Sequence, residues 1–171
     1  MKATFSASNA LKVAFTALVT PEVIDSARRV GQGSGMDSDL DVDGTTLFHR
    51  TMPFTERLGI EVLSHSAGLV RARIAHDPTL CTLGGTLHGG VLMALADSAA
   101  AVCAHLNLPE GAQGTTTIES RTSFLRAVRA GHATASARPL QAGRRVIVVE
   151  TEIHDDEGRL AAKVTQSQAV R

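Results

Sequence analysis

The sequence of 171 residues contains no tryptophan and no tyrosine, and aromatic side chains make up only 3% of it. Hydrophobic residues still account for 43%, so aliphatic side chains must form almost all of the core. Neither charge is in excess, because 17 basic residues balance 17 acidic ones. A basic excess is typical of proteins that bind nucleic acids or anionic membranes. We therefore expect neither a nucleic acid nor a membrane as a partner.

Metal-binding patterns and disulfide frameworks are also missing from the sequence. Cys81 and Cys103 lack a CxxC spacing, and the seven histidines never fall at i, i+4 or in a Cys/His cluster. The segment Asp39–Gly44 imitates the start of an EF-hand calcium loop, but the twelfth position is Arg50 instead of glutamate. No apolar run is expected to approach the roughly 18 residues of a membrane span. The sequence thus predicts a cytoplasmic protein with reduced cysteines and no metal.

Two regions with different patterns divide the chain, whose length suits one globular domain. Residues 8–30 carry apolar side chains at helical spacing, and the glycine-rich segment 31–35 follows as a flexible joint. We interpret residues 1–50 as an N-terminal helical appendage with a flexible linker. The folded domain is then predicted to span residues 51–171.

This domain is predicted to contain two strands, one helix and four further strands. The first two strands are expected over 58–63 and 69–74, and the helix over 89–105. The last four strand-like runs are 115–125, 132–140, 144–154 and 160–169. Short turns separate these four runs, and the alternating helices of a doubly wound fold are missing. This order predicts an α+β fold in which an antiparallel sheet wraps around one helix.

The predicted helix carries the most informative motif. Thr86-Leu87-His88-Gly89-Gly90 opens directly into a run that is apolar on nearly every face and contains one carboxylate, Asp97. A helix that is apolar all round is normally buried. Burying an ionised carboxylate without partners costs several kcal/mol. A chain that keeps Asp97 in a buried helix is therefore expected to use it chemically.

Several segments together resemble one protein family. They are Leu58-Gly59-Ile60, Gly85-Thr86-Leu87-His88-Gly89-Gly90, Asp97 nine residues after the histidine, Phe124-Leu125-Arg126, Gly143-Arg144 and Glu157-Gly158-Arg159-Leu160-Ala161-Ala162. The chain resembles the hotdog-fold acyl-CoA thioesterases over roughly residues 53–170, closest to the phenylacetyl-CoA (PaaI-like) type near the 4-hydroxybenzoyl-CoA thioesterases. The resemblance implies a sheet around a central helix, homodimers often paired into homotetramers, and acyl-CoA hydrolysis without metal or cofactor.

The resemblance also implies roles for individual residues. Gly89 would supply a backbone N–H that polarises the thioester carbonyl, and the unpaired N–H groups at a helix start suit this task. Asp97 would act as the general base or as the nucleophile, and the sequence does not choose between these routes. His88 would shape the loop. Thr117 would help to hold the attacking water.

Two more residues, Gly90 and Thr82, are expected to contact the substrate. A glycine at position 90 lets the backbone come close to a ligand because no Cβ intervenes. Thr82 departs from the family pattern, since many members have asparagine six residues before the histidine. A threonine hydroxyl has a shorter reach and fewer donors than an asparagine amide.

The spacing along the helix also bears on assembly. Gly89 and Asp97 are eight residues apart, which is about 12 Å along a helix axis. An oxyanion donor and a carboxylate that serve one carbonyl must both lie within about 3–4 Å of the reacting atoms. We therefore expect a site shared across a two-fold axis, in a homodimer or homotetramer, with Gly89 near the partner's Asp97.

Two other functions stay open at this stage. A hotdog enoyl-CoA hydratase would need an acid–base pair in a different loop motif, and His76-Asp77-Pro78 lacks that arrangement. A non-catalytic acyl-CoA-binding sensor would use residues 1–50 as an interaction segment, but simple binding gives no reason to keep a buried carboxylate. The sequence favours an acyl-CoA thioesterase that acts on an aromatic or medium-chain acyl group.

Overall fold

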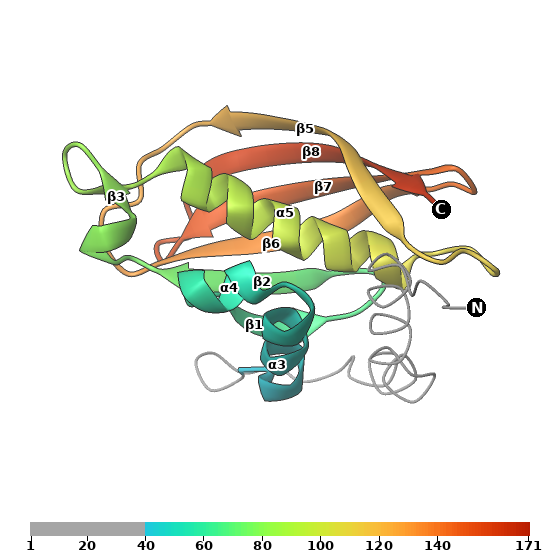
Figure 1. The fold of residues 1–171 in the computed structure, drawn as a ribbon. Coiled ribbons are helices and arrows are strands. Elements are labelled where there is room, and N and C mark those ends of the chain that lie inside the picture. The colour runs from blue at the N-terminus through green and yellow to red at the C-terminus, as the bar shows by residue number, and fades with distance from the viewer. Residues whose placement is uncertain (1–39) are drawn as a thin grey trace, which may run out of the picture.

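A six-stranded antiparallel sheet curves around one long helix, α5 (Gly89–Leu106), in the computed structural model, which describes residues 40–171 (Figure 1). The strands lie side by side in the order β1 (Glu61–His65), β2 (Val70–Ala75), β6 (His132–Ala142), β7 (Val146–Asp155), β8 (Leu160–Val170) and β5 (Thr115–Phe124). This arrangement confirms the α+β class and the sheet wrapped on one helix. The predicted helix and the last four predicted strands agree with the structure to within two residues at each end.

The region before the first strand differs from the prediction. Two helices, α3 (Val42–Thr51) and α4 (Pro53–Leu58), precede it, so Leu58 ends a helix instead of lying in a strand. Gly59 follows α4 with a φ of 66°, a left-handed conformation that glycine adopts without steric penalty. Strand β1 therefore begins at Glu61, three residues later than predicted.

A short segment that was not predicted leads into α5. It consists of the 3₁₀ turn η1 (Pro78–Leu80) and a small hairpin of β3 (Cys81–Thr82) and β4 (Thr86–Leu87). The N–H of His88 donates to the carbonyl of Leu80 over 2.9 Å. This hydrogen bond fixes the start of α5 against the hairpin.

Helix α3 belongs to the folded unit, although the sequence analysis placed it in the appendage. The side chain of Phe48 is fully buried in the core. On β1, the N–H of Val62 donates to the hydroxyl of Thr45 over 2.8 Å. The fold therefore begins before the predicted boundary at residue 51. The predicted helix over 8–30 and the linker over 31–35 lie outside the described residues.

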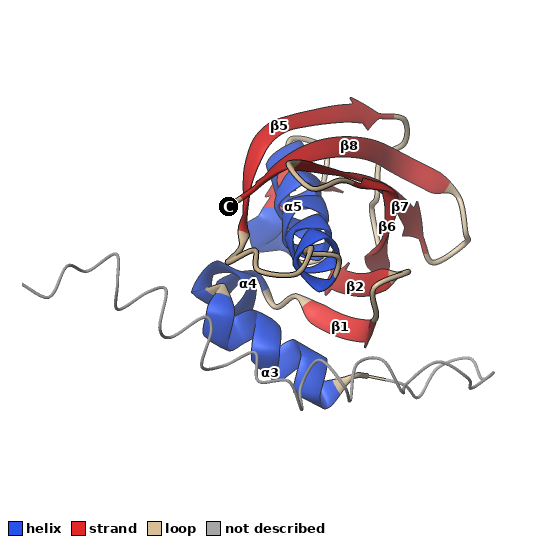
Figure 2. Cartoon of the chain, turned by 90° about the vertical axis from the view of Figure 1, so that its right-hand side faces the viewer, coloured by secondary structure: helices blue, strands red, loops and turns tan. Residues whose placement is uncertain are grey.

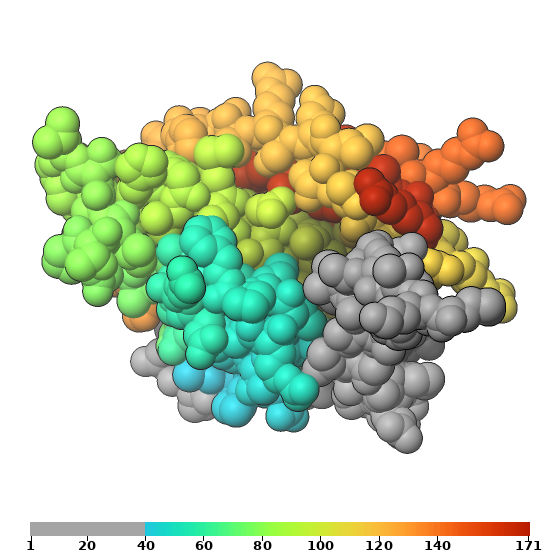
Figure 3. Space-filling model, viewed as in Figure 1, coloured from blue at the N-terminus to red at the C-terminus, as the bar shows by residue number. Residues whose placement is uncertain are grey.

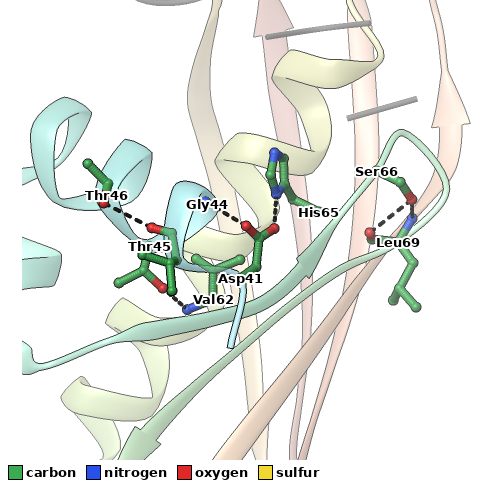
Figure 4. Close-up of polar contacts among 9 residues, drawn as sticks. Asp41, Gly44, Thr45, Thr46, Val62, His65, Ser66 and Leu69 are labelled. Carbon is green, nitrogen blue, oxygen red and sulfur yellow. Dashed lines mark hydrogen bonds and ion pairs between the residues drawn. The ribbon is translucent and has the colours of Figure 1, made fainter. Parts of the chain in front are cut away.

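Asp41 connects the start of α3 to the end of β1 (Figure 4). One of its carboxylate oxygens accepts a hydrogen bond from the N–H of Gly44 at 2.7 Å, as the N-cap of α3. The other lies 2.5 Å from Nδ1 of His65. Asp41 is one of the aspartates in the segment that imitates a calcium loop, and its carboxylate caps a helix. In the described part of the chain, no group of three or more His, Cys, Asp or Glu side chains is placed to hold a metal.

The core lies between α5 and the concave face of the sheet (Figure 2). On the sheet side, alternate residues of the strands are fully buried, among them Ala133, Ala135 and Ala137 of β6. Small side chains on both α5 and β6 allow the helix to approach the sheet closely. By length and composition α5 could also cross a membrane, a run that the sequence analysis did not expect. Its packing against the sheet is that of a core helix.

Candidate active site

One face of α5 is exposed in the single chain, contrary to the prediction of a helix buried on all sides. Gly90, Met93 and Asp97 are exposed and lie at i, i+3 and i+7, so they form a stripe along the helix. In Figure 3, atoms of α5 reach the surface between β5 and α4. Asp97 is therefore not a buried carboxylate within one chain. We call the stripe of these three residues the open face of α5.

The start of α5 leaves one backbone donor without an acceptor. His88 is the N-cap, and its Nδ1 accepts a hydrogen bond from the N–H of Gly90 at 2.9 Å. The N–H groups of Val91 and Leu92 donate to the carbonyl of His88, at 2.9 and 3.4 Å. No acceptor among residues 40–171 binds the N–H of Gly89. In the first turn, Gly89 therefore holds the N–H group that is free to donate to a ligand.

The same arrangement separates the two glycines of the motif. The N–H of Gly90 is occupied by His88, so this residue does not offer the ligand a second free donor. Because Nδ1 of His88 accepts this bond, the ring is the tautomer with its hydrogen on Nε2. His88 thus shapes the helix start through its own side chain, as an N-cap residue does.

Gly89 also lies against an aromatic ring. A Cβ placed at this residue would come within 3.0 Å of Cζ of Phe124, at the end of β5. Phe124 itself is 54% exposed, so its ring borders the free N–H of Gly89 without filling the space around it. Glycine at position 89 therefore keeps the approach to its N–H open.

Farther along α5, one oxygen of Asp97 is held by two side chains of the sheet. The amide Nε2 of Gln166 on β8 donates to Oδ1 over 2.6 Å, and the hydroxyl of Thr117 on β5 donates to the same oxygen over 3.3 Å. The Thr117 hydroxyl in turn accepts a hydrogen bond from Nε2 of Gln168 at 2.8 Å. Oδ2 of Asp97 has no hydrogen-bond partner among residues 40–171. The structure thus brings two of the predicted site residues, Thr117 and Asp97, into contact.

A β-bulge in β5 makes this arrangement possible. The register of β5 against β8 shifts between Thr117 and Glu119, so Thr117 lies opposite Gln168 and Ser120 lies opposite Gln166. Without the bulge, residues 117 and 120 would point to opposite faces of the sheet. Three residues around Asp97 and Thr117 were not predicted from the sequence, namely Gln166, Gln168 and Ser120. For the two glutamines, one signal exists in the sequence. They take two alternate positions of β8, whereas the other residues on the same face of this strand are apolar.

The other titratable groups of α5 do not provide a second ionised side chain. Burial raises the pKa of the Cys103 thiol to about 12, so the thiol stays protonated at neutral pH. Burial also lowers the pKa of His105, which favours the neutral imidazole. Burial therefore disfavours a charge on both Cys103 and His105.

The remaining predicted residues are not gathered around one carboxylate in a single chain. Thr82 is exposed on β3, where it pairs with Thr86. Gly89 and Asp97 stand at different heights on the same helix, about 12 Å apart along its axis. One chain therefore supplies a free backbone donor and a carboxylate, but at two separate places.

Comparison with known proteins places this geometry in a family. Residues 84–162, which include α5 and most of the sheet, match the model of the Thioesterase superfamily. The chain is 31% identical over 115 residues to a Mycobacterium tuberculosis protein named "Putative esterase Rv1847", which covers 66% of this chain and 82% of the relative. The chain belongs to the thioesterase superfamily. It is a hydrolase of this superfamily, which confirms the family resemblance at this level.

Solved structures of the superfamily share the fold. The crystal structure of thioesterase HI1161 from Haemophilus influenzae superposes with a TM-score of 0.70 at 27% identity, over 79% of this chain and 92% of that one. The structure of Rv1847 itself superposes with a TM-score of 0.66 at 29% identity, over 69% of this chain and 95% of that one. The thioesterase hotdog fold expected from the sequence is therefore confirmed.

Proposed function

We propose that this thioesterase-superfamily chain hydrolyses the thioester of an aromatic or medium-chain acyl-CoA, in the manner of the PaaI-like enzymes. The observation that carries the proposal is the state of Asp97. Its Oδ1 accepts two hydrogen bonds from the sheet, while Oδ2 is left open on an exposed face of the helix. A carboxylate held at one oxygen and open at the other is suited to act as a base or a nucleophile.

The chemistry needs one further group, an oxyanion donor. As the carbonyl oxygen of the thioester gains charge, the free N–H of Gly89 would stabilise it, aided by the helix dipole. In the general-base route, Asp97 takes a proton from water and the resulting hydroxide attacks the carbonyl carbon. The C–S bond then breaks, and CoA leaves as a thiolate that takes up the proton. In the nucleophilic route, Asp97 attacks the carbonyl carbon, the C–S bond breaks and CoA leaves as a thiolate, which gives a mixed anhydride. Water then hydrolyses the anhydride, which releases the free acid and restores Asp97, and the thiolate takes up the proton.

Both groups would meet at a dimer interface. Beside the open face of α5, strand β5 forms one edge of the sheet, and within the described part of the chain it pairs with β8 alone. Large apolar side chains are exposed there, including Met93 (41%), Ile118 (62%) and Phe124 (54%). An open strand edge flanked by apolar side chains is normally covered by another chain. A two-fold axis beside β5 would bring Gly89 to the partner's Asp97 and create two sites per dimer.

The proposed substrate contacts follow from this placement. Gly89 and the apolar side chains around it would border the thioester and the acyl group, whereas Thr82 and Gly90 would contact the substrate through their exposed surfaces. The proposal includes a cytoplasmic enzyme that needs no cofactor, assembled as a homodimer or as a homotetramer of two such dimers.

The direct test is thiol release from a panel of aromatic and aliphatic acyl-CoAs, followed with a thiol reagent. We expect turnover of at least one aromatic or medium-chain thioester and no hydration of an enoyl-CoA. Tight acyl-CoA binding without thiol release from any member of the panel would contradict the proposal and favour a binding protein. Hydration of an enoyl-CoA without hydrolysis would favour the hydratase.

The shared site can be tested by combining two defective chains. A chain with Asp97→Asn and a chain with Gly89→Pro each lack one half of every shared site. In a mixed dimer, purified through two different affinity tags, one of the two sites would contain both intact groups. We expect this dimer to recover about half of the wild-type rate. A mixed dimer as inactive as its parents, or a monomer active at the full rate, would contradict the shared site.

A further inference from the structure

A glutamine in the core of the sheet contacts the carboxylate of the proposed site. Gln166 lies in the middle of β8, on the strand face that packs toward α5, and only 1% of it is exposed. Its Nε2 donates to Oδ1 of Asp97 over 2.6 Å and to the hydroxyl of Ser120 over 3.3 Å. Both amide hydrogens are therefore engaged, and the shorter bond goes to a charged acceptor.

The other end of the same amide is not satisfied. Oε1 of Gln166 is buried and has no hydrogen-bond partner among residues 40–171, and the same holds for the hydroxyl of Thr151 on the neighbouring strand β7. A buried acceptor without a donor destabilises a fold, so a side chain of similar size without polar atoms would suit this position better. The packing of the core does not explain why a glutamine stands here. The contact with Asp97 does.

We propose that Gln166 is a positioning residue that anchors Oδ1 of Asp97, so that Oδ2 is the oxygen that reacts. This inference rests on the proposed role of Asp97 as base or nucleophile. Two donors on one oxygen, from Gln166 and Thr117, fix the plane of the carboxylate and direct Oδ2 away from the sheet.

The test compares Gln166→Met with Thr151→Val. Methionine keeps the length of the side chain but removes both the donor and the unpaired acceptor. We expect its melting temperature to be equal to or above that of the wild type, while kcat falls by about 10–100-fold with little change in KM. Thr151→Val removes an equally buried, unpaired hydroxyl that does not touch Asp97, and we expect its kcat and pH profile to be those of the wild type.

An isosteric variant covers the case in which the methionine variant does not fold. Gln166→Glu keeps the shape of the side chain but places an acceptor against Oδ1, so the two carboxyl groups would share a proton. Because the second carboxyl group disfavours ionisation of the pair, we expect the acid limb of the pH profile of kcat/KM to move to higher pH in this variant. A folded Gln166→Met or Gln166→Glu variant with the kcat and pH profile of the wild type would overturn the positioning role. If Asp97→Asn were inactive in the same experiment, the proposed function would stand, whereas a fully active Asp97→Asn would remove the proposed function itself.

Discussion

Replacing Asp97 with asparagine is expected to lower kcat for acyl-CoA hydrolysis by about 10²–10⁴-fold, the contribution typical of a positioned base. Asparagine has nearly the same shape, and its Oδ1 can still accept the hydrogen bonds from Gln166 and Thr117. The variant therefore loses the negative charge and the proton acceptor while the surrounding contacts remain. Thiol release at saturating acyl-CoA measures the effect.

A matched control separates this chemical loss from a general effect of charge. Asp43 is an exposed carboxylate in the first turn of α3, outside the proposed site. We expect Asp43→Asn to keep the wild-type kcat. Size-exclusion chromatography should show the same oligomer for both variants. An Asp97→Asn variant with the wild-type rate would show that Asp97 has only a structural role.

Removing the backbone donor of Gly89 is expected to lower kcat by about 10²–10³-fold, as the loss of one oxyanion-hole donor does in other acyl-transfer enzymes. Proline does this without breaking the helix. Position 89 is the first helical residue after the N-cap, where proline is well tolerated. The preceding His88 has φ −62° and ψ 137°, the extended conformation that a residue before proline prefers. Gly89→Pro should therefore fold, and thiol release again provides the measurement.

Gly89→Ala is the control for the steric part of that change. Both variants place a Cβ near the ring of Phe124, where it would lie 3.0 Å from Cζ, but alanine keeps the N–H. We expect the alanine variant to lose less of its kcat than the proline variant. Equal losses in the two variants would mean that the space beside Phe124, and not the donor, determines the rate.

The helix and most of the sheet could be predicted because their residues follow a simple period. In β6 and β7, buried and more exposed positions alternate as a strand with one face on the core requires. The start of the domain was harder to predict. Phe48 is buried within a segment that is otherwise rich in polar residues, so the pattern resembled a linker. The left-handed Gly59 ends α4 where apolar residues alone favoured a strand.

The candidate site was predictable only in part, because part of it depends on contacts between distant segments. His88, Gly89 and Asp97 lie in one continuous motif and could be found by spacing. Gln166 is 69 residues from Asp97, and nothing in the local pattern of β8 indicates this contact. The bulge at Ile118 also changes which residues of β5 point to which face of the sheet. The face on which Ser120 lies could therefore not be derived from the two-residue period of a regular strand.

The exposure of Asp97 shows a different limit of predicting burial from the sequence. An apolar pattern indicates which surfaces leave water, but it does not say whether the same chain or another chain covers them. Helix α5 was correctly predicted to be apolar on nearly every side, yet its open face is uncovered within one chain. The prediction of burial was wrong for the single chain for this reason.

Strand β5 contacts both positions of α5 that we propose to take part in the reaction. Thr117 contacts Asp97 near one end of the strand, and Phe124 borders Gly89 at the other. Among residues 40–171, the strand has a neighbouring strand on one side only, which is β8. A second chain that paired with its open side would brace the carboxylate and the donor of both sites together. Association of two chains would then activate the enzyme. Subunits separated by dilution would lose the half of each site that the partner supplies, and their own half would be less rigid.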